Sequence, residues 1–364
     1  MEIKTLNLIQ FRNYEKQTFH FHPLVNIIIG DNAQGKTNIL EAIYLLSTTR
    51  SFKSRMLDEM IMFDQSYTRV SGHVVNGTRP YDLKVVVSKE GKKAFINDKA
   101  VSKTSDYLGY FNVILFTPQD LQLIKGSPKM RRTLIDTEIS KISPIYMFNL
   151  NKYNKLMKER NKYLKMLHDG HKEPDMYLEV LSEEMAELEE DLIQRRMKFI
   201  ELLNEISEQM YAYISGKEKL VLRYHTQFKD ISKEGILDKY KKNYKRDIFQ
   251  GTTVDGIHKD DLKIFLDEND AGMFASQGQQ RSIILSMKIA LVEIVKMQIG
   301  EYPVLLLDDV LSELDEERKM KLLNLIDHKV QTFITTTHFD LGYHHSLDDA
   351  LVLRIEKGTL KEDK

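Results

Sequence analysis

The stretch that decides the fold is Gly30-Asp31-Asn32-Ala33-Gln34-Gly35-Lys36-Thr37. It has the G-x-x-x-x-G-K-[ST] spacing of a phosphate-binding loop. The apolar run 25–29 before it predicts a buried strand, and residues 38–46 after it predict a helix. In that order, backbone N–H groups and a helix N-terminus converge on phosphate oxygens. We therefore expect a nucleoside triphosphate site, with Lys36 at the β- and γ-phosphates and the Thr37 hydroxyl on Mg²⁺.

Length, charge and composition narrow the possible domain organisation, binding partners and site chemistry. A chain of 364 residues predicts two domains, or one domain with an insertion. The 53 basic and 54 acidic residues leave a net charge of −1, so any polyanion site must be a local patch. Cysteine is absent, which excludes disulfides, cysteine metal ligands and thiol nucleophiles. The N-terminus has no apolar signal region, and we expect a soluble, cytoplasmic protein.

Both ends of the chain combine strands with helices. The first 120 residues predict short strands, including a hairpin through 81–96 and a buried strand at 113–116. The last part predicts a helix over 278–298, strands at 304–307 and 332–336, a helix from 316, and a closing hairpin over 351–360. The sheet begun in the first 120 residues is therefore expected to be completed by the last 120.

The middle of the chain has helical periodicity instead. Apolar residues recur at heptad spacing on two segments, with Arg160 and Arg195 as polar interruptions: Leu150, Tyr153, Met157, Leu164 and Leu167, then Leu178, Leu181, Met185, Leu188, Leu192, Phe199, Leu202 and Ile206. This predicts an antiparallel helical hairpin whose longer arm has roughly 35 residues, or about 50 Å. We expect residues 1–120 and 249–364 to form the two halves of one α/β domain, with a helical lobe inserted over 121–248.

A second set of polar residues completes the expected nucleotide site. The apolar strand 304–307 ends in Asp308 and Asp309. Beside a phosphate loop, Asp308 is expected to hold Mg²⁺ and Asp309 to orient and deprotonate the attacking water. Ser276-Gln277-Gly278-Gln279-Gln280 opens the helix over 278–298 and predicts a second anion site, although such a string is often only a helix cap.

Taken in order, these pieces resemble the head of ABC-type ATPases: a mixed sheet with a β-rich subdomain and an inserted α-helical lobe. Within that superfamily the chain resembles the RecF family. The resemblance rests on Leu8-Ile9-Gln10-Phe11-Arg12-Asn13-Tyr14, the phosphate loop through Asn38, Arg50-Ser51-Phe52, Gly126-Ser127-Pro128, Ser276 to Gln280, Asp308-Asp309 and Ser312-Glu313-Leu314-Asp315. Two strings depart from the family pattern: Gly256-Ile257-His258-Lys259-Asp260-Asp261 lacks its usual proline, and Pro118-Gln119-Asp120 replaces Pro-Glu-Asp.

The resemblance implies site residues beyond those taken from the motifs. Asn38 and Arg50 would lie near the phosphates of ATP, and Gln119 or Asp120 would be the glutamine loop that contacts the metal and the water. His338, which follows Thr337, would be the histidine switch. Ser276, Gly278 and Gln279 would contact the ATP of a partner subunit in a face-to-face homodimer.

The resemblance also implies a role. It would be a weak ATPase that uses ATP to switch DNA binding at gaps during recombinational repair and replication. Proteins of the RecO and RecR type would be its partners, and together they would help RecA displace single-strand-binding protein. The sequence leaves open whether single-stranded DNA, duplex or a gap junction is preferred.

One basic run is the first candidate for DNA contact. Lys239, Lys241, Lys242, Lys245 and Arg246 are interleaved with Tyr240 and Tyr244, and Asp247 is the one acid counted against them. Solvated surface is the alternative interpretation. Lysines on the helical hairpin, such as Lys152, Lys155 and Lys162, are the next candidates.

Three other functions share part of this pattern. An SMC or RecN-like chromosome-maintenance head has the same fold but carries a much longer helical arm. A P-loop kinase acting on a small molecule needs no signature motif and works as a monomer. An ABC transporter subunit works with separate membrane partners. ATP hydrolysis that DNA stimulates, at a rate rising with protein concentration, favours the RecF-like function.

Overall fold

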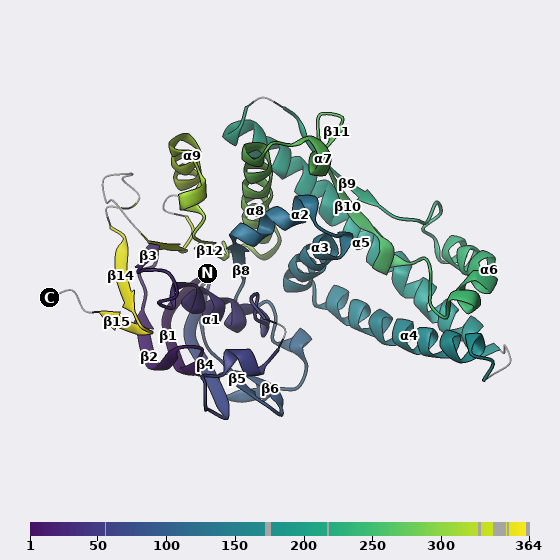
Figure 1. Cartoon of the computed structure of the whole chain (residues 1–364), viewed down its shortest axis with the longest axis horizontal. Helices are drawn as coiled ribbons and strands as arrows, with labels where there is room; N and C mark the ends of the chain where they lie inside the picture. The colour runs from purple at the N-terminus through teal and green to yellow at the C-terminus, as the bar shows by residue number, and fades with distance from the viewer. Residues whose placement is uncertain are drawn as a thin grey trace. The chain divides into compact units, whose positions relative to one another are not determined.

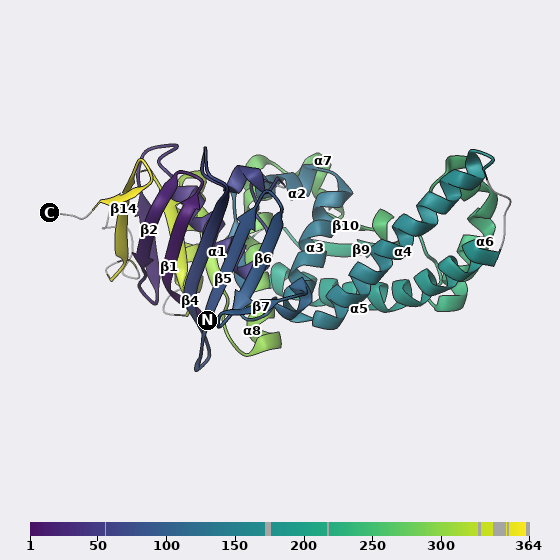
Figure 2. The same cartoon turned by 90° about the horizontal axis from the view of Figure 1, so that it is seen from below.

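The computed structural model describes residues 1–54, 56–171, 176–216, 218–326, 329–337, 347 and 349–361. The chain divides into two compact units (Figures 1 and 2). The first comprises Met1–Leu121, Gln209–Lys217 and Gln277–Lys364, and the second comprises Gln122–Glu208 and Glu218–Ser276. Among the described residues, no helix is long and apolar enough to cross a membrane.

The main sheet of the first unit joins the two ends of the chain. Its order is β15-β14-β3-β13-β12-β8, parallel except for the antiparallel hairpin of β14 and β15. The strands are β3 (Val25–Ile29), β8 (Val113–Phe116), β12 (Val304–Asp308), β13 (Thr332–Thr336), β14 (Leu351–Glu356) and β15 (Thr359–Lys361). The central strands are buried along nearly their whole length, as their continuous apolar runs predict. The expectation that the last 120 residues complete this sheet is confirmed.

A second sheet of the first unit is antiparallel and has the order β2-β1-β4-β5-β6-β7 (Figure 2). Its strands are β1 (Glu2–Phe11), β2 (Tyr14–His20), β4 (Tyr67–Asn76), β5 (Arg79–Ser88), β6 (Gly91–Ile96) and β7 (Lys99–Val101). The predicted hairpin of β5 and β6 is present, with Val85 opposite Ala94. Alternate residues of these strands are buried because only one face of the sheet packs on the core.

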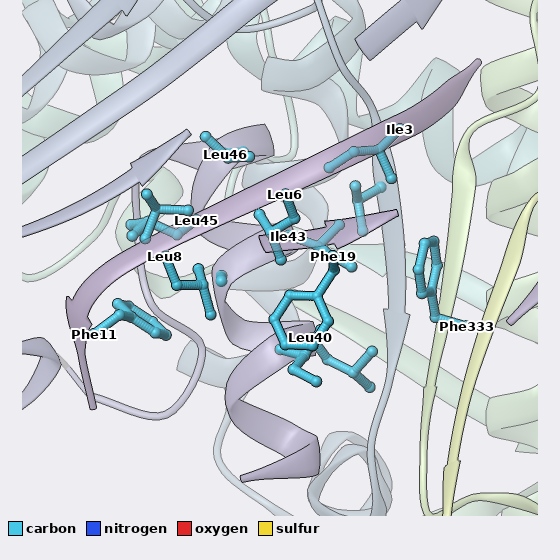
Figure 3. Packing of buried hydrophobic residues seen from close by; sticks show 14 of the residues in the cluster. Ile3, Leu6, Leu8, Phe11, Phe19, Leu40, Ile43, Leu45, Leu46 and Phe333 are labelled. Carbon is cyan, nitrogen blue, oxygen red and sulfur yellow. The ribbon is translucent and has the colours of Figure 1, made fainter. Parts of the chain in front are cut away.

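Helix α1 (Lys36–Thr48) lies between the two sheets and supplies most of the core. It contacts β4 and β5 of the antiparallel sheet and β8, β12 and β13 of the main sheet. Leu40, Ile43 and Leu46 pack with Leu6 and Phe333 in one buried cluster (Figure 3). Because α1 follows the phosphate loop directly, this packing also holds the loop at the edge of the main sheet.

In the part of the first unit that the structure describes, α1 is accompanied by α8 (Gln277–Ile299), α9 (Glu316–Ile326) and the final turns of α5. Short 3₁₀ turns include η1 (Asp58–Met60), η2 (Thr104–Asp106), η3 (Pro118–Leu121) and η5 (Leu311–Glu313). Helix α8 packs against β8, where Lys288 Nζ donates to the Leu115 carbonyl at 2.6 Å. The predicted helix over 278–298 is therefore present, and most of its residues between Gln280 and Val295 are buried.

The second unit is built around the predicted helical hairpin. Helix α4 (Pro144–His168) and helix α5 (Met176–Ile214) run antiparallel and lie side by side in Figures 1 and 2. Asn149 Nδ2 donates to Asp191 at 2.8 Å, and Arg160 Nε donates to Ser182 Oγ at 3.1 Å. Helix α4 begins where it does because Ser143 caps it and Pro144 follows. At 39 residues, α5 is slightly longer than expected.

The remaining elements of the second unit were not all anticipated. They are α2 (Gln122–Lys125), α3 (Pro128–Ile142), α6 (Lys233–Gln250), η4 (Ile257–Lys259) and α7 (Ala271–Phe274), with the strands β9 (Leu220–His225), β10 (Asp261–Leu266) and β11 (Asn269–Asp270). The strands form a separate sheet of order β11-β10-β9, which the short, partly charged segments did not predict. Because β10 pairs with β9 and packs on α3, residues 249–276 belong to this unit. The return to the first unit therefore occurs at Gln277, not at the expected residue 249.

Candidate nucleotide-binding site

The phosphate loop has a shape that only its own glycines permit. Gly35, the residue before α1, has φ +114, and Ala33 has φ +65. A Cβ added at Gly35 would lie within 3.0 Å of the Asn13 amide and the Tyr14 hydroxyl. A Cβ at Gly30 would lie 2.4 Å from the Ile355 carbonyl oxygen. The two motif glycines therefore stand where neighbouring residues leave no space for a side chain, and β3 and α1 flank the loop as expected.

The loop borders a cavity of about 220 Å³ at the edge of the main sheet. It is lined by Asp31, Asn32, Ala33, Gly35, Lys36, Thr37, Asn38, Lys53, Asp308, Asp309 and Thr335. Lys36 Nζ donates to the carbonyls of Gly30 and, at 2.9 Å, Asp31. Burial lowers the pKa of Lys36, while the charges of Asp309 and Asp308 oppose that shift. The cavity thus joins a cation to backbone N–H donors, which is the arrangement that binds phosphate.

The two carboxylates at the end of β12 differ in their surroundings. Asp308 Oδ1 accepts from Thr37 Oγ1 at 2.8 Å and from Thr335 Oγ1 at 2.9 Å. Burial raises the pKa of Asp308, and these two hydrogen bonds oppose the rise. Asp309 has φ +53, and its N–H donates to Thr335 Oγ1 at 2.9 Å. Ser312 Oγ donates to Asp309 Oδ1 at 3.0 Å. The motifs predicted both carboxylates, but Thr335 went unrecognised because a threonine inside an apolar strand carries no distinctive pattern.

A lysine occupies the place where an arginine was expected. Arg50 and Lys53 are both exposed, and of the two only Lys53 lines the cavity. Lys53 Nζ donates to Asn38 Oδ1 at 2.8 Å. Burial lowers the pKa of Lys53, with the charges of Glu41 and Asp308 opposing the shift. The string Arg50-Ser51-Phe52-Lys53 holds two cations, and only the course of the chain after α1 decides which one faces the cavity.

Among the residues that the structure describes, the expected glutamine loop does not line the cavity. Gln119 is exposed and is absent from the lining. Asp120 accepts from Thr117 N–H at 2.7 Å and pairs with Lys288 at 2.9 Å, so its carboxylate is engaged within η3 and α8. His338 lies outside the described residues. The metal and catalytic roles given to Gln119 and His338 remain predictions.

The residues expected to contact the ATP of a partner subunit, Ser276, Gly278 and Gln279, do not line this chain's own cavity. Ser276 is exposed directly before α8, and a Cβ at Gly278 would meet nothing within 4 Å. One turn further on, Arg281 pairs with Glu313 at 3.5 Å, and Arg318 Nε donates to Ser282 Oγ at 2.9 Å. These contacts tie the start of α8 to the segment that follows Asp309.

The basic run on α6 is partly neutralised. Lys239 pairs with Asp255 at 3.1 Å, and Lys242 pairs with Asp238. The expectation that Asp247 is the only acid nearby is therefore wrong, because the fold brings Asp255 back to α6. Lys241, Lys245 and Arg246 are exposed. Of the tyrosines, Tyr240 is buried and donates to Glu189 at 2.7 Å, and Tyr244 packs on the buried cluster of Tyr163, Leu164, Leu167 and Leu178. The aromatic interleaving therefore serves packing, and the lysines and arginine alone face solvent.

Comparisons with known proteins identify the family of this chain. The family model of the RecF/RecN/SMC N terminal domain matches residues 2–355. The DNA replication and repair protein RecF of Halalkalibacterium halodurans is 42% identical over 370 residues and covers 100% of both chains. The RecF of Bacillus subtilis is 40% identical over 368 residues, covering 99% of this chain and 100% of its own.

Solved structures give the same result. The recombination mediator protein RecF-ATP superposes with a TM-score of 0.90 at 33% identity, covering 99% of this chain and 96% of the other. The Smc head domain of Pyrococcus furiosus has a TM-score of 0.58 at 18% identity, a likeness of fold alone. Full-length identity to the RecF relatives, with the ABC-type head fold, shows that the chain belongs to the RecF family of DNA replication and repair proteins.

Proposed function

We propose that this protein binds ATP with Mg²⁺ and hydrolyses it slowly. We further propose that the bound nucleotide regulates its binding to DNA during recombinational repair. The observation that carries the proposal is the contact of Thr37 with Asp308 inside the cavity that Lys36 borders. It joins the two halves of a phosphate site from positions 271 residues apart in the chain. The likeness to the RecF-ATP structure supports ATP as the nucleotide.

The residues present fit a magnesium ion. Thr37 and Asp308 offer a hydroxyl and a carboxylate oxygen 2.8 Å apart, and oxygen ligands are those that Mg²⁺ prefers. Bound there, the ion would neutralise charge that develops on the β- and γ-phosphate oxygens. Lys36 and the backbone N–H groups of residues 33–37 would hold the phosphates, and Lys53, which also lines the cavity, would add a second positive charge.

Asp309 is the proposed general base. It lies beside Asp308 in the cavity, and its carboxylate is now engaged by the Ser312 hydroxyl. Aspartate is one methylene shorter than the glutamate common at this position in related heads, so it reaches a water less well. A weak ATPase is therefore expected, as suits a switch.

Dimerisation is the proposed response to ATP. The exposure of Ser276 and the open space at Gly278 leave α8's first turn accessible to the nucleotide of a second copy. Phosphate would then be bound by both subunits. We further propose that the ATP-bound dimer holds DNA through basic patches such as the one on α6, acts in the cytoplasm, and works with mediator proteins of the RecR and RecO type, because the solved relative is described within the RecFOR pathway.

The experiment that tests this function measures ATP binding and turnover with and without DNA. Wild-type protein should bind ATP, and DNA should raise a slow turnover that grows faster than linearly with protein concentration. Lys36→Met should abolish ATP binding while the thermal unfolding midpoint stays unchanged. Asp309→Asn should keep ATP binding and lower turnover by about 10² to 10⁴-fold.

Three results would contradict the proposed function or the role of a residue in it. Turnover proportional to protein concentration and indifferent to DNA, with phosphate passed to a small molecule, would support a kinase instead. Unchanged ATP affinity of Lys36→Met would remove the phosphate loop from the mechanism. Near-normal hydrolysis by Asp309→Asn would place the base elsewhere.

A further inference from the structure

The turn between β1 and β2 touches the back of the phosphate loop. Asn13 Nδ2 donates to the Gln34 carbonyl at 3.0 Å, and the Tyr14 hydroxyl donates to the Gly35 carbonyl at 3.1 Å. The missing side chain of Gly35 is what allows Asn13 and Tyr14 to approach this closely. The function described above gives no task to Arg12, Asn13 and Tyr14, yet they form the wall on which the loop rests.

A second turn reaches the same point from the other end of the chain. In the turn between β14 and β15, Gly358 N–H donates to the Gln34 carbonyl at 3.0 Å, and Lys357 N–H donates to Gln34 Oε1 at 2.6 Å. A Cβ at Gly358 would lie 2.2 Å from the Asn13 carbonyl oxygen. The Gln34 carbonyl is thus held by two turns more than 340 residues apart in the sequence, which fixes the loop without nucleotide.

The turn between β1 and β2 also contacts helix α1, through the buried carboxylate of Glu41. Arg12 donates to Glu41 through Nε at 2.9 Å and through Nη2 at 2.6 Å. Glu41 lies on α1 and is 0% exposed, so this charge has to be paired. Ser51 Oγ donates to Glu41 Oε1 at 2.5 Å and accepts the N–H groups of Lys53 and Ser54, each at 3.0 Å. Glu41 therefore holds the segment that carries Lys53.

The contacts close into a ring around the cavity wall. Lys53 Nζ donates to Asn38 Oδ1, and Asn38 Nδ2 donates to Asn13 Oδ1, both at 2.8 Å. The ring thus runs from Arg12 through Glu41 and Ser51 to Lys53, and returns through Asn38 to Asn13. Lysine on its flexible stem samples many rotamers when unsupported, so a fixed segment and a fixed acceptor pre-organise its charge.

We propose that Glu41 and Ser51 are positioning residues that place Lys53 for recognition of the γ-phosphate, and that Arg12 and Asn13 brace both Lys53 and the phosphate loop. This inference rests on the proposed ATP binding. Lys53 and the proposed metal ligand Asp308 line the same cavity, and we place the metal-bridged γ-phosphate at this end of it. A diphosphate has no group at that end, and its binding does not use Lys53.

The test compares ATP and ADP affinity in Ser51 variants by direct titration. Ser51→Ala frees the segment from Glu41 and should weaken ATP binding about tenfold while ADP binding changes less than about twofold. Ser51→Thr keeps the hydroxyl and should restore ATP affinity. Ser54→Ala is the matched control, because among the described residues the Ser54 hydroxyl bonds to the backbone of Met56 in the same segment and not to Glu41. Asn13→Ala removes contacts to the loop and to Asn38, so unlike Ser51→Ala it should weaken ADP binding as well as ATP binding.

A double-mutant cycle decides whether Ser51 acts through Lys53. If it does, Ser51→Ala added to Lys53→Ala should produce no further loss of ATP affinity. Additive losses, equal losses of ATP and ADP affinity in Ser51→Ala, or unchanged ATP affinity in that variant would each overturn the proposal. Wild-type protein that binds neither nucleotide would instead overturn the proposed function.

Discussion

At the scale of single residues, one hydroxyl connects the two carboxylates of the site. Thr335 Oγ1 donates to Asp308 Oδ1 and accepts the N–H of Asp309, and Thr335 is 1% exposed. Asp309 has a left-handed backbone, which costs energy for a residue with a side chain. The hydrogen bond from its N–H to Thr335 helps to hold that conformation. Thr335 is therefore a positioning residue for both the proposed metal ligand and the proposed base.

Thr335→Val keeps the shape of the side chain and removes the hydroxyl. Asp308 then loses one of its two hydrogen-bond donors, and the N–H of Asp309 loses its acceptor. We expect the Mg²⁺ concentration for half-maximal turnover to rise about threefold to tenfold, with kcat reduced more than ATP affinity. Magnesium titrations of turnover and of ATP binding measure both effects. Thr335→Ser should behave as wild type, and a serine variant as impaired as the valine variant would contradict this role.

At the scale of elements, buried charges join the helices of the second unit. Arg160, which interrupts the apolar seam of α4, is 1% exposed and pairs with Asp247 of α6 at 2.8 Å. Glu189 of α5 is 0% exposed, and it accepts from Tyr240 of α6 at 2.7 Å and from Ile257 N–H at 3.0 Å. Arg160, which looks like a defect in the heptad pattern, is thus a point at which α4 is joined to α6, and Glu189 joins α5 to α6.

Glu189 makes the stability of this unit depend on pH. Burial raises the pKa of Glu189 from 4.5 to about 7, with the hydrogen bond from Tyr240 opposing the rise. Between these values the unfolded chain loses the proton while the folded chain keeps it, so stability falls as pH rises through that window. Above about pH 7 the cost is constant, at up to about 3 kcal/mol.

Glu189→Gln should remove this part of the pH dependence. The difference in free energy of unfolding between wild type and variant, from urea denaturation, should therefore change between pH 4.5 and about 7 and be flat outside that range. Taking the difference cancels the groups whose titration is independent of Glu189. Glu201→Gln, at an exposed position of the same helix, is the control and should show no such window. A flat difference for Glu189→Gln would mean that the carboxyl is ionised throughout.

At the scale of the whole molecule, the nucleotide is proposed to act through assembly. A phosphate bound by Lys36 of one copy and the start of α8 of another makes ATP affinity and dimer affinity depend on each other. The net charge of −1 gives no general attraction for DNA, so affinity must come from local basic contacts. A dimer doubles the number of these contacts and should therefore bind DNA more tightly than a monomer.

Ser276→Arg tests the assembly. A long cation at this exposed position should obstruct the partner's γ-phosphate contact, so the variant should bind ATP as a monomer and fail to dimerise. Sedimentation with a slowly hydrolysed ATP analogue distinguishes the two states. Ser102→Arg adds the same charge at an exposed position directly after β7 of the antiparallel sheet, and this variant should dimerise normally. A Ser276→Arg dimer of normal affinity is incompatible with a signature contact between subunits.

DNA affinity should follow salt concentration steeply. If the dimer neutralises about six phosphates, the slope of log K against log salt should be near −5. Replacing Lys241, Lys242 and Lys245 with glutamate should weaken binding to all sequences and flatten that slope, without changing ATP affinity. Glutamate at Lys89, Lys329 and Lys361 changes the net charge equally and should have a small effect. If the α6 variant binds DNA normally, the patch lies elsewhere, and Lys155 and Lys162 on α4, both exposed, are tested next.

The sequence alone determined the features that a contiguous segment can encode. The phosphate loop is such a segment, with glycine at positions 30 and 35 and a strand and a helix on either side, all within one short stretch of sequence. Heptad spacing predicted the hairpin of α4 and α5, and apolar runs predicted the strands of the main sheet, because burial imposes a period on the residues that meet the core.

Only the tertiary structure decided which distant residues meet. Periodicity and motifs carry no record of where a chain turns, so they could not choose Lys53 over Arg50 for the cavity, or place Thr335 between Asp308 and Asp309. They also could not show that the turn at Asn13 and the turn at Gly358 meet behind Gln34, or that residues 249–276 pair with β9. Each of these depends on a hydrogen bond or close approach between segments far apart in sequence, and such contacts exist only after the chain has folded.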